Sequence, residues 1–180
     1  QPSDTPSDEP SDLPSSFPST EPEWLLFGAD IDGENTNDAS SRAVSLSSDG
    51  KTVAIGADFN DGNRLFFSGH VRVYGLDDDP LSPSWKQLGK DIDGEKAFDR
   101  SGIGVSLSSD GNTVAIGAFS NDGINGLFFS GHVSVYRLDD DPASPSWRQL
   151  GRDIDGENAD DRSGRAVSLS SDGNTVAIGA

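Results

Sequence analysis

The sequence VSLSSDGNTVAIGA occupies residues 105–118 and recurs without change at 167–180. A third copy, VSLSSDGKTVAIGA at 44–57, differs only in having lysine in place of asparagine. In each copy the serine-rich half alternates apolar and polar residues, SDG is a tight-turn signal, and TVAIGA is β-branched and apolar. Each copy therefore predicts two short strands joined by a turn, that is, a β-hairpin.

The hairpins belong to a longer repeat. Trp24, Trp85 and Trp147 are 61 and 62 residues apart along the chain. The additional residue falls where NDGINGLFFSG replaces NDGNRLFFSG, which predicts a loop there because loops tolerate insertions. A period of this length is typical of supersecondary units repeated as an array, solenoid or propeller.

Each repeat holds four strand-like runs. In the second repeat they are GVSLSS at 104–109, TVAIGA at 113–118, HVSVYRL at 132–138 and WRQLG at 147–151. No long window has a period of 3.6 residues, so almost no helix is expected. Short strands joined by turns are typical of a propeller blade, and we predict an all-β partial propeller of antiparallel four-stranded blades. The predicted blades cover about 43–89, 104–151 and, incompletely, 166–180.

The segment before the repeats has a different composition. Residues 1–22 carry proline at every fourth position among serine and aspartate, which predicts a disordered, extended linker ahead of repeats at 23–180. The segment resembles the PSxxPS stalks of secreted and wall-associated proteins of diatoms and related algae. A plain spacer and a stalk modified on its hydroxyl groups both fit it. Because the sequence has no methionine, we expect either a removed signal segment or an excerpt of a longer chain.

Composition narrows the class of partner. Lys and Arg total 13 against 31 Asp and Glu, giving a formal net charge of −18. Nucleic acids and anionic membranes attract clustered basic residues, so neither is an expected partner. No apolar run approaches the length of a membrane span, and the absence of cysteine excludes disulfides. An acidic, soluble surface of this kind favours a secreted or extracellular protein, associated with a cell wall or cell surface.

The repeated run SGxxVSLSSDGNTVAIGAxxNDG, followed by SGHVxVYxLD and WxQLG, resembles the FG-GAP repeats of integrin-α-like β-propellers over about 24–180. VAIGA stands where that family has an apolar strand ending in Gly-Ala-Pro, and GHVRVY or GHVSVY where it has a Gly-x-x-Tyr-Val strand. The resemblance implies a secreted propeller of the adhesion type. The family's calcium site lies between the first two strands of a blade, where this chain has only SSDG. That turn is too short to surround a calcium ion, so no calcium ligand is implied there.

Another acidic segment links each repeat to the next. It reads GADIDGENTNDAS, GKDIDGEKAFDRS and GRDIDGENADDRS, with acids at i, i+2, i+4 and i+8. Oxygens at that spacing could surround a hard cation such as Ca²⁺, and we predict weak calcium binding. Asp, Gly and Asn are also typical of solvated turns, and that alternative stays open. The candidate ligands are Asp30, Asp32, Glu34, Asp38, Asp91, Asp93, Glu95, Asp99, Asp153, Asp155, Glu157 and Asp161.

Aromatic pairs and histidines recur near these acids. The pairs Phe66–Phe67 and Phe128–Phe129 are candidate partner-binding residues that could anchor a protein or stack on a glycan, or could fold back over the sheet. His70 and His132 each follow a glycine at the start of a third strand. Their repetition favours a hydrogen-bonding role, because a catalytic histidine is needed once, beside its partner.

Near-identical repeats fit binding better than catalysis, since an active site breaks repeat symmetry. We therefore predict a non-catalytic extracellular adhesion or matrix module that binds protein or glycan. The alternative is an accessory propeller domain of a larger secreted hydrolase. Paired carboxylates, which glycoside hydrolysis uses, are compatible with this alternative. Uncovered strand edges at the outer repeats would be covered by further blades of the same chain or by self-association.

Overall fold

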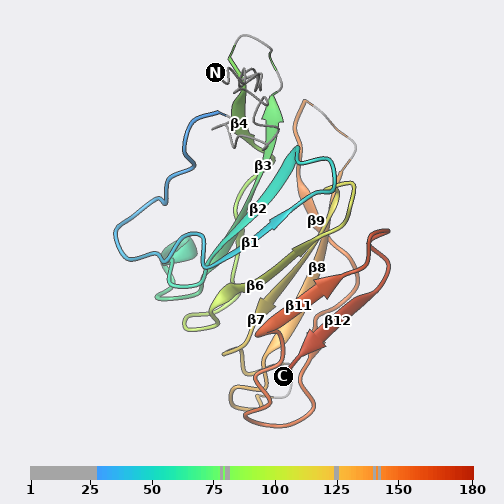
Figure 1. The fold of residues 1–180 in the computed structure, drawn as a ribbon. Coiled ribbons are helices and arrows are strands. Elements are labelled where there is room, and N and C mark those ends of the chain that lie inside the picture. Colours follow the sequence, from blue (N-terminus) through green and yellow to red (C-terminus); the bar gives the residue numbers. More distant parts are fainter. Residues whose placement is uncertain (1–27, 78, 80–81, 124–125, 140, 142) are drawn as a thin grey trace, which may run out of the picture.

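The computed structural model describes residues 28–180 except 78, 80–81, 124–125, 140 and 142 (Figure 1). The predicted linker at 1–22 lies outside the described residues. The described chain is all-β with antiparallel sheets, and its helical content is a single 3₁₀ turn at Gly62–Arg64. No helix in this part of the chain is long and apolar enough to cross a membrane.

The first sheet follows chain order. Its four neighbouring strands are β1 (Ala43–Leu46), β2 (Thr52–Ala57), β3 (His70–Asp77) and β4 (Ser84–Gln87). Every pairing is antiparallel, so the sheet is a simple meander. The alternating sequence and the short turn at 47–50 account for the first hairpin, in which Val44 pairs with Ile55.

The second sheet repeats the first. Its strands are β6 (Ser101–Leu107), β7 (Thr113–Ala118), β8 (His132–Leu138) and β9 (Trp147–Gln149), again in chain order. A third, two-stranded sheet is formed by β11 (Ala166–Leu169) and β12 (Val176–Gly179). Two of the predicted runs, 113–118 and 132–138, are confirmed at their stated bounds.

The acidic segments contain a strand that the sequence did not indicate. β5 (Ile92–Asp93) pairs with the beginning of β3, and β10 (Ile154–Asp155) pairs with the beginning of β8. β4 pairs with the other end of β3. The edge of β3 is therefore covered first by β5, near its beginning, and then by β4, near its end. The start of the DIDGE sequence is therefore part of the sheet's outer edge rather than a free loop.

A compact hydrogen-bond network closes each hairpin. In the second repeat, Ser108 Oγ donates to Asp110 Oδ1 at 2.5 Å and accepts from the backbone N–H of Thr113 at 3.0 Å. The Asp110 carboxylate also accepts from the backbone N–H of Asn112 at 3.0 Å. The same bonds occur around Ser47 and Ser170. These bonds lower the pKa of Asp110.

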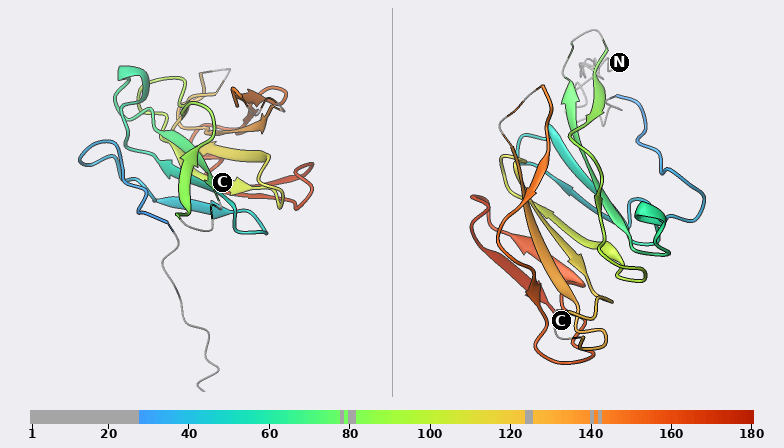
Figure 2. Two further views of the ribbon diagram at one scale, coloured as in Figure 1. Left: turned by 90° about the horizontal axis from the view of Figure 1, so that it is seen from above. Right: turned by 180° about the vertical axis from the view of Figure 1, so that it is seen from behind.

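The three hairpins lie next to one another, as both the front and rear views indicate (Figures 1 and 2). Serines of one first strand bond to the next: Ser45 Oγ accepts from the Leu107 N–H, and Ser106 Oγ accepts from the Leu169 N–H, both at 2.9 Å. The turns are joined as well, through Ser48 N–H to the Ser109 carbonyl at 3.0 Å. The serines of VSLSS thus link neighbouring sheets, which explains why the sequence recurs.

The main core lies between the first two sheets. It contains Ala54, Val71, Val73, Ile92, Leu107, Val114 and Ile116, with Val105, Tyr136 and Trp147 packed against it. Trp147 also donates from Nε1 to the Leu88 carbonyl of the preceding repeat at 2.7 Å. This tryptophan therefore packs between the sheets of two successive repeats. Burial of these side chains is the main favourable contribution to the fold.

Glycine is required where neighbouring sheets approach most closely. A Cβ atom added to Gly56 would lie 2.0 Å from the Gly102 carbonyl oxygen, and one added to Gly117 would lie 1.8 Å from the Gly164 oxygen. Both are the glycine of VAIGA. Backbone therefore packs directly against backbone, and no side chain fits at either place.

We expect Gly117→Ala to destabilise the protein by roughly 1–3 kcal/mol or more, because the added methyl group overpacks a backbone contact. Gly179→Ala is the matched control, since it changes the same position of the third copy, where the nearest atom to an added Cβ is 3.3 Å away. Urea unfolding of both variants would measure the difference. Equal stabilities would show that the sheets separate readily at Gly117.

We also expect a pH dependence from the turn carboxylates. The pKa of Asp110 is lower in the folded protein than its ordinary value of 3.8. Its stabilising contribution is therefore present above pH 3.8 and is lost as the pH falls through the folded-state pKa. The variant Asp110→Asn should lose less stability than the wild type over that acidic range. Unfolding curves with parallel pH profiles for the two proteins would contradict this expectation.

Candidate functional site

The aromatic loop of one repeat is hydrogen-bonded to the acidic segment of the next. The carbonyls of Phe66, Phe67 and Ser68 accept from the N–H groups of Phe98, Arg100 and Ser101 at 2.8–3.1 Å. The corresponding bonds recur one repeat later, from Asp160, Arg162 and Ser163 to the segment 128–130. The aromatic loop and the following acidic segment therefore lie side by side at one end of the sheets.

The aromatic pairs divide into exposed and packed members. Phe66 is 66% exposed and Phe128 is 71% exposed. Phe67 instead contacts Phe59 edge to face, with ring centroids 5.5 Å apart, and also lies near Phe98. The first phenylalanine of each pair therefore faces solvent, and the second one of the first pair folds back.

The acids of a single segment do not converge on one point. The last acid caps its own loop: Asp38, Asp99 and Asp161 accept from the N–H groups of residues 35, 96 and 158 at 2.7–2.8 Å. Asp93 accepts from Asn63 Nδ2 at 2.7 Å, and burial raises its pKa. The remaining candidates include exposed Asp30, Asp32 and Glu157, while Asp155 borders the pocket beside His132 that is described below. Calcium binding by one segment alone stays a prediction.

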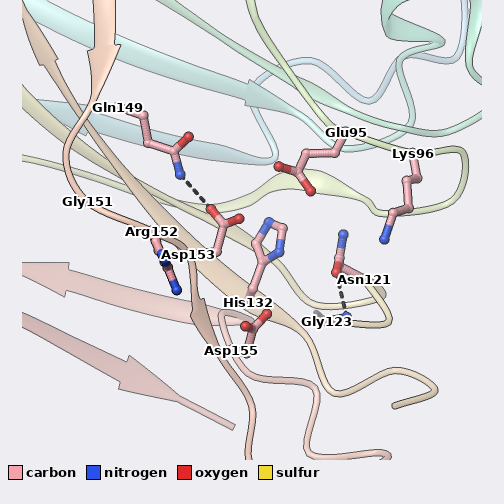
Figure 3. A pocket seen from close by; sticks show the side chains of 10 residues that line it. All are labelled: Glu95, Lys96, Asn121, Gly123, His132, Gln149, Gly151, Arg152, Asp153 and Asp155. Atoms are coloured by element: carbon pink, nitrogen blue, oxygen red, sulfur yellow. Dashed lines mark hydrogen bonds between the residues drawn. The ribbon is translucent and has the colours of Figure 1, made fainter. Parts of the chain in front are cut away.

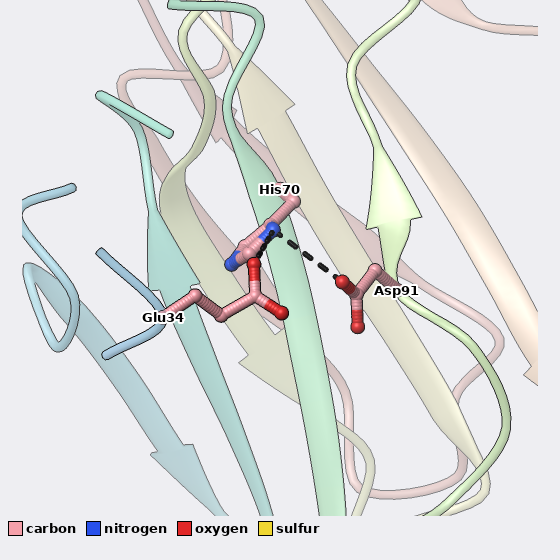
Figure 4. A group of neighbouring side chains, drawn as sticks. All are labelled: Glu34, His70 and Asp91. Atoms are coloured by element: carbon pink, nitrogen blue, oxygen red, sulfur yellow. Dashed lines mark ion pairs between the residues drawn. The ribbon is translucent and has the colours of Figure 1, made fainter. Parts of the chain in front are cut away.

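The structure instead combines acids of successive segments around a histidine. Glu34, His70 and Asp91 each place a ligand-type atom within 4.8 Å of the other two (Figure 4). His70 Nδ1 lies 3.7 Å from Asp91 Oδ2 and 3.9 Å from Glu34 Oε2. Burial lowers the pKa of His70, although Asp91 and Glu34 oppose the shift. Burial therefore favours the neutral imidazole, in which one ring nitrogen keeps a lone pair.

The same arrangement occurs one repeat later. Glu95, His132 and Asp153 also lie within 4.8 Å of one another, and they border a pocket of about 590 Å³ (Figure 3). Asp153 Oδ1 accepts from Gln149 Nε2 at 2.7 Å, as Asp91 Oδ1 accepts from Gln87 Nε2 at 2.6 Å. Each aspartate is thus oriented by a glutamine of the adjoining outer strand.

The sequence reasoning treated the histidines as structural and grouped the acids by their nearness in sequence. Both histidines are buried at the start of a third strand, beside β5 or β10. The available signal was the recurrence of histidine directly before a strand whose partner segment begins with Asp-Ile-Asp. It could not be interpreted without knowing that this segment pairs with the histidine's own strand.

A separate buried carboxylate lies beneath the aromatic loop of the first repeat. Asp58 is 1% exposed, and Arg100 Nη1 approaches its Oδ2 to 3.5 Å while Arg42 Nε approaches its Oδ1 to 3.9 Å. The Arg100 guanidinium also stacks over Phe59, 3.8 Å from the ring centroid. Burial raises the pKa of Asp58 and outweighs the two arginines. The second repeat has Phe119 at this position, so the cluster is specific to the first repeat.

Comparison with known proteins gives no family. A scan against protein-family models finds no match, and a search of the curated proteins finds no similar sequence. The resemblance to FG-GAP repeats therefore rests on the sequence motifs alone.

We expect Asp58 to affect the pH dependence of stability in the opposite direction to the turn carboxylates, and the variant Asp58→Asn to remove this effect. Because the folded-state pKa of Asp58 lies above its ordinary 3.8, the wild type loses stability as the pH rises from 3.8 through the folded-state pKa. The asparagine variant lacks this loss, so its stability relative to the wild type should increase across the same range. Denaturant unfolding between pH 3.5 and 7 would measure it. A relative decrease would mean that the arginines outweigh burial.

Proposed function

We propose that the chain is a non-catalytic extracellular binding module of the adhesion or matrix type, built from FG-GAP-like β-propeller blades. Two observations support the blade interpretation: each complete sheet is a four-stranded meander, and the first strands of successive sheets lie side by side. Sheets arranged in this way around an axis make a propeller. Closure of the ring belongs to the proposal.

The binding surface that we propose is the end of the sheets that carries the aromatic loops. Phe66 and Phe128 occupy equivalent positions in successive repeats and are both exposed, which is the observation that carries the proposal. Large solvent-exposed aromatic side chains provide much of the affinity of protein interfaces and sugar sites. Between the repeats lies a pocket of about 370 Å³ lined by Phe98, Arg100, Phe119, Ser120, Phe129 and Arg162.

The charge of the chain limits the partner. A net charge of −18 disfavours strongly anionic polysaccharides, whereas a neutral glycan or a protein with a basic face is compatible with it. Within the pocket, Arg100 and Arg162 offer hydrogen-bond donors beside aromatic rings. That combination suits hydroxyl-rich or carbonyl-bearing ligands, with the rings covering apolar faces. Weak calcium binding by the acidic segments remains part of the proposal.

The test is binding of the full chain to immobilised neutral cell-wall polysaccharides and to extracellular matrix proteins. We expect the double variant Phe66→Ala/Phe128→Ala to weaken binding by roughly 10-fold or more, as loss of interface anchors usually does. Leu46→Ala is the control: Leu46 is 56% exposed but lies at the other end of β1, next to the turn. Equal loss in the control, or no loss in the double variant, would remove this surface from consideration.

A further inference from the structure

The two histidine clusters have the composition of a metal site and not that of an acidic patch. Each supplies one imidazole nitrogen and two carboxylate oxygens from three separate segments of the chain. His70 is 1% exposed and His132 is 5% exposed, and among the described residues neither ring makes a hydrogen bond. Their ring nitrogens are not among the fully buried polar atoms that lack a partner in the described part of the chain, so these nitrogens border space that water or a metal ion can enter.

We propose that Glu95, His132 and Asp153, and in the preceding repeat Glu34, His70 and Asp91, each bind a divalent transition-metal ion of the Zn²⁺ class. The proposal is independent of the aromatic binding surface, since it uses none of the aromatic residues, but it assigns four of the candidate calcium ligands, Glu34, Asp91, Glu95 and Asp153, to a different metal. The recurrence of the same three residue types at equivalent positions gives two separate instances of the arrangement.

The donors determine the class of metal. Imidazole with carboxylates suits zinc and its neighbours, whereas calcium takes six to eight oxygen ligands. Zinc bonds of about 2.0–2.2 Å require donors that lie roughly 3–4 Å apart. His70 Nδ1 already lies 3.7 and 3.9 Å from the two carboxylate oxygens, so small side-chain movements complete the geometry. Three protein ligands leave the fourth position open to water or to a ligand.

The neighbouring groups resemble the outer shell of a metal site. Gln87 and Gln149 hold the aspartates, and Asn60 Nδ2 approaches Glu34 Oε2 at 3.3 Å. Partners of this kind fix the orientation of metal ligands, and their loss usually lowers affinity about 10–100-fold. In the second cluster, Ser134 donates to Asp153 as well.

The two clusters differ by one substitution in the third strand. Arg72 follows His70 by two positions, and its Nη1 lies 3.9 Å from Glu34 Oε1. The equivalent residue after His132 is Ser134, which carries no charge. The other charged groups around the second cluster are Lys96, Arg152 and Asp155, and those around the first are Lys90 and Asp93. Each cluster thus has two basic residues nearby, but among the described lysines and arginines only Arg72 forms an ion pair with a ligand carboxylate. Because this ion pair competes with metal binding by Glu34, we expect the second cluster to bind the ion more tightly.

The experiment is calorimetric titration of the full chain with Zn²⁺, followed by Co²⁺ titration read by visible absorption, which reports a nitrogen and oxygen ligand set. We expect two saturable sites of unequal affinity. His132→Gln should abolish the tighter site, and Arg72→Ser should strengthen the weaker one about tenfold by removing a nearby positive charge. Ca²⁺ in equal amount should displace little Zn²⁺.

Because a buried histidine variant could misfold, the double variant Glu95→Gln/Asp153→Asn is the second test, with circular dichroism to verify the fold. It should also lose the tighter site. Asp160→Asn, which removes an exposed carboxylate outside both clusters, is the matched charge control and should bind Zn²⁺ as the wild type does. Unchanged Zn²⁺ affinity in a folded His132→Gln or double variant would overturn the proposal, and so would equal competition by Ca²⁺.

Discussion

Backbone hydrogen bonds between each aromatic loop and the following acidic segment hold the sheets in register with one another. They join the carbonyls of residues 66–68 to the N–H groups of 98, 100 and 101, and they recur in the next repeat. Ser68 and Ser130, at the middle of these contacts, are fully buried, so their backbone groups must find partners within the protein. The bonds form only if the chain passes very close to the preceding sheet, which is why Gly56 and Gly117 cannot carry a side chain.

The same contacts place the groups of the histidine clusters. Gly94 N–H donates to the Gly69 carbonyl at 2.8 Å, and these glycines directly precede Glu95 and His70 in the chain. The backbone bond thus fixes the positions from which the acid and the histidine side chains extend. A short side chain such as that of Asp91 has little freedom to move away. The sites are consequently set by the joining of repeats rather than by the sequence of any one loop.

The sequence predicted the hairpins and the third strands well because their signals are local. Alternation identifies a strand, Asp-Gly identifies a turn, and threefold recurrence reinforces both at 44–57 and its copies. It did not predict β5 or β10, since two residues are too few to show a period. Ile92 pairs with Val71 because the chain leaves the edge of β3 after β4 and returns to it at β5. This return depends on contacts with β3, which lies distant in the sequence.

The carboxylates of the candidate site were predictable from the sequence, but the role of its histidines and the grouping of the acids were not. Nearness in sequence suggested that Asp91, Asp93, Glu95 and Asp99 act together, yet they face different neighbours. Asp99 caps its own loop, and Asp93 bonds to Asn63 of the preceding repeat. The role of Asp58 was likewise invisible, because its arginines come from two different segments.

The division of each acidic segment between two histidines has an evolutionary consequence. Asp91 faces His70 of the preceding repeat, whereas Glu95 of the same segment faces His132 of the following one. Duplication of a whole repeat would therefore create one complete new cluster at each new junction, wherever in the repeat the copied unit begins. Damage to a single acidic segment would instead impair two clusters at once, so drift in that segment is constrained from both sides.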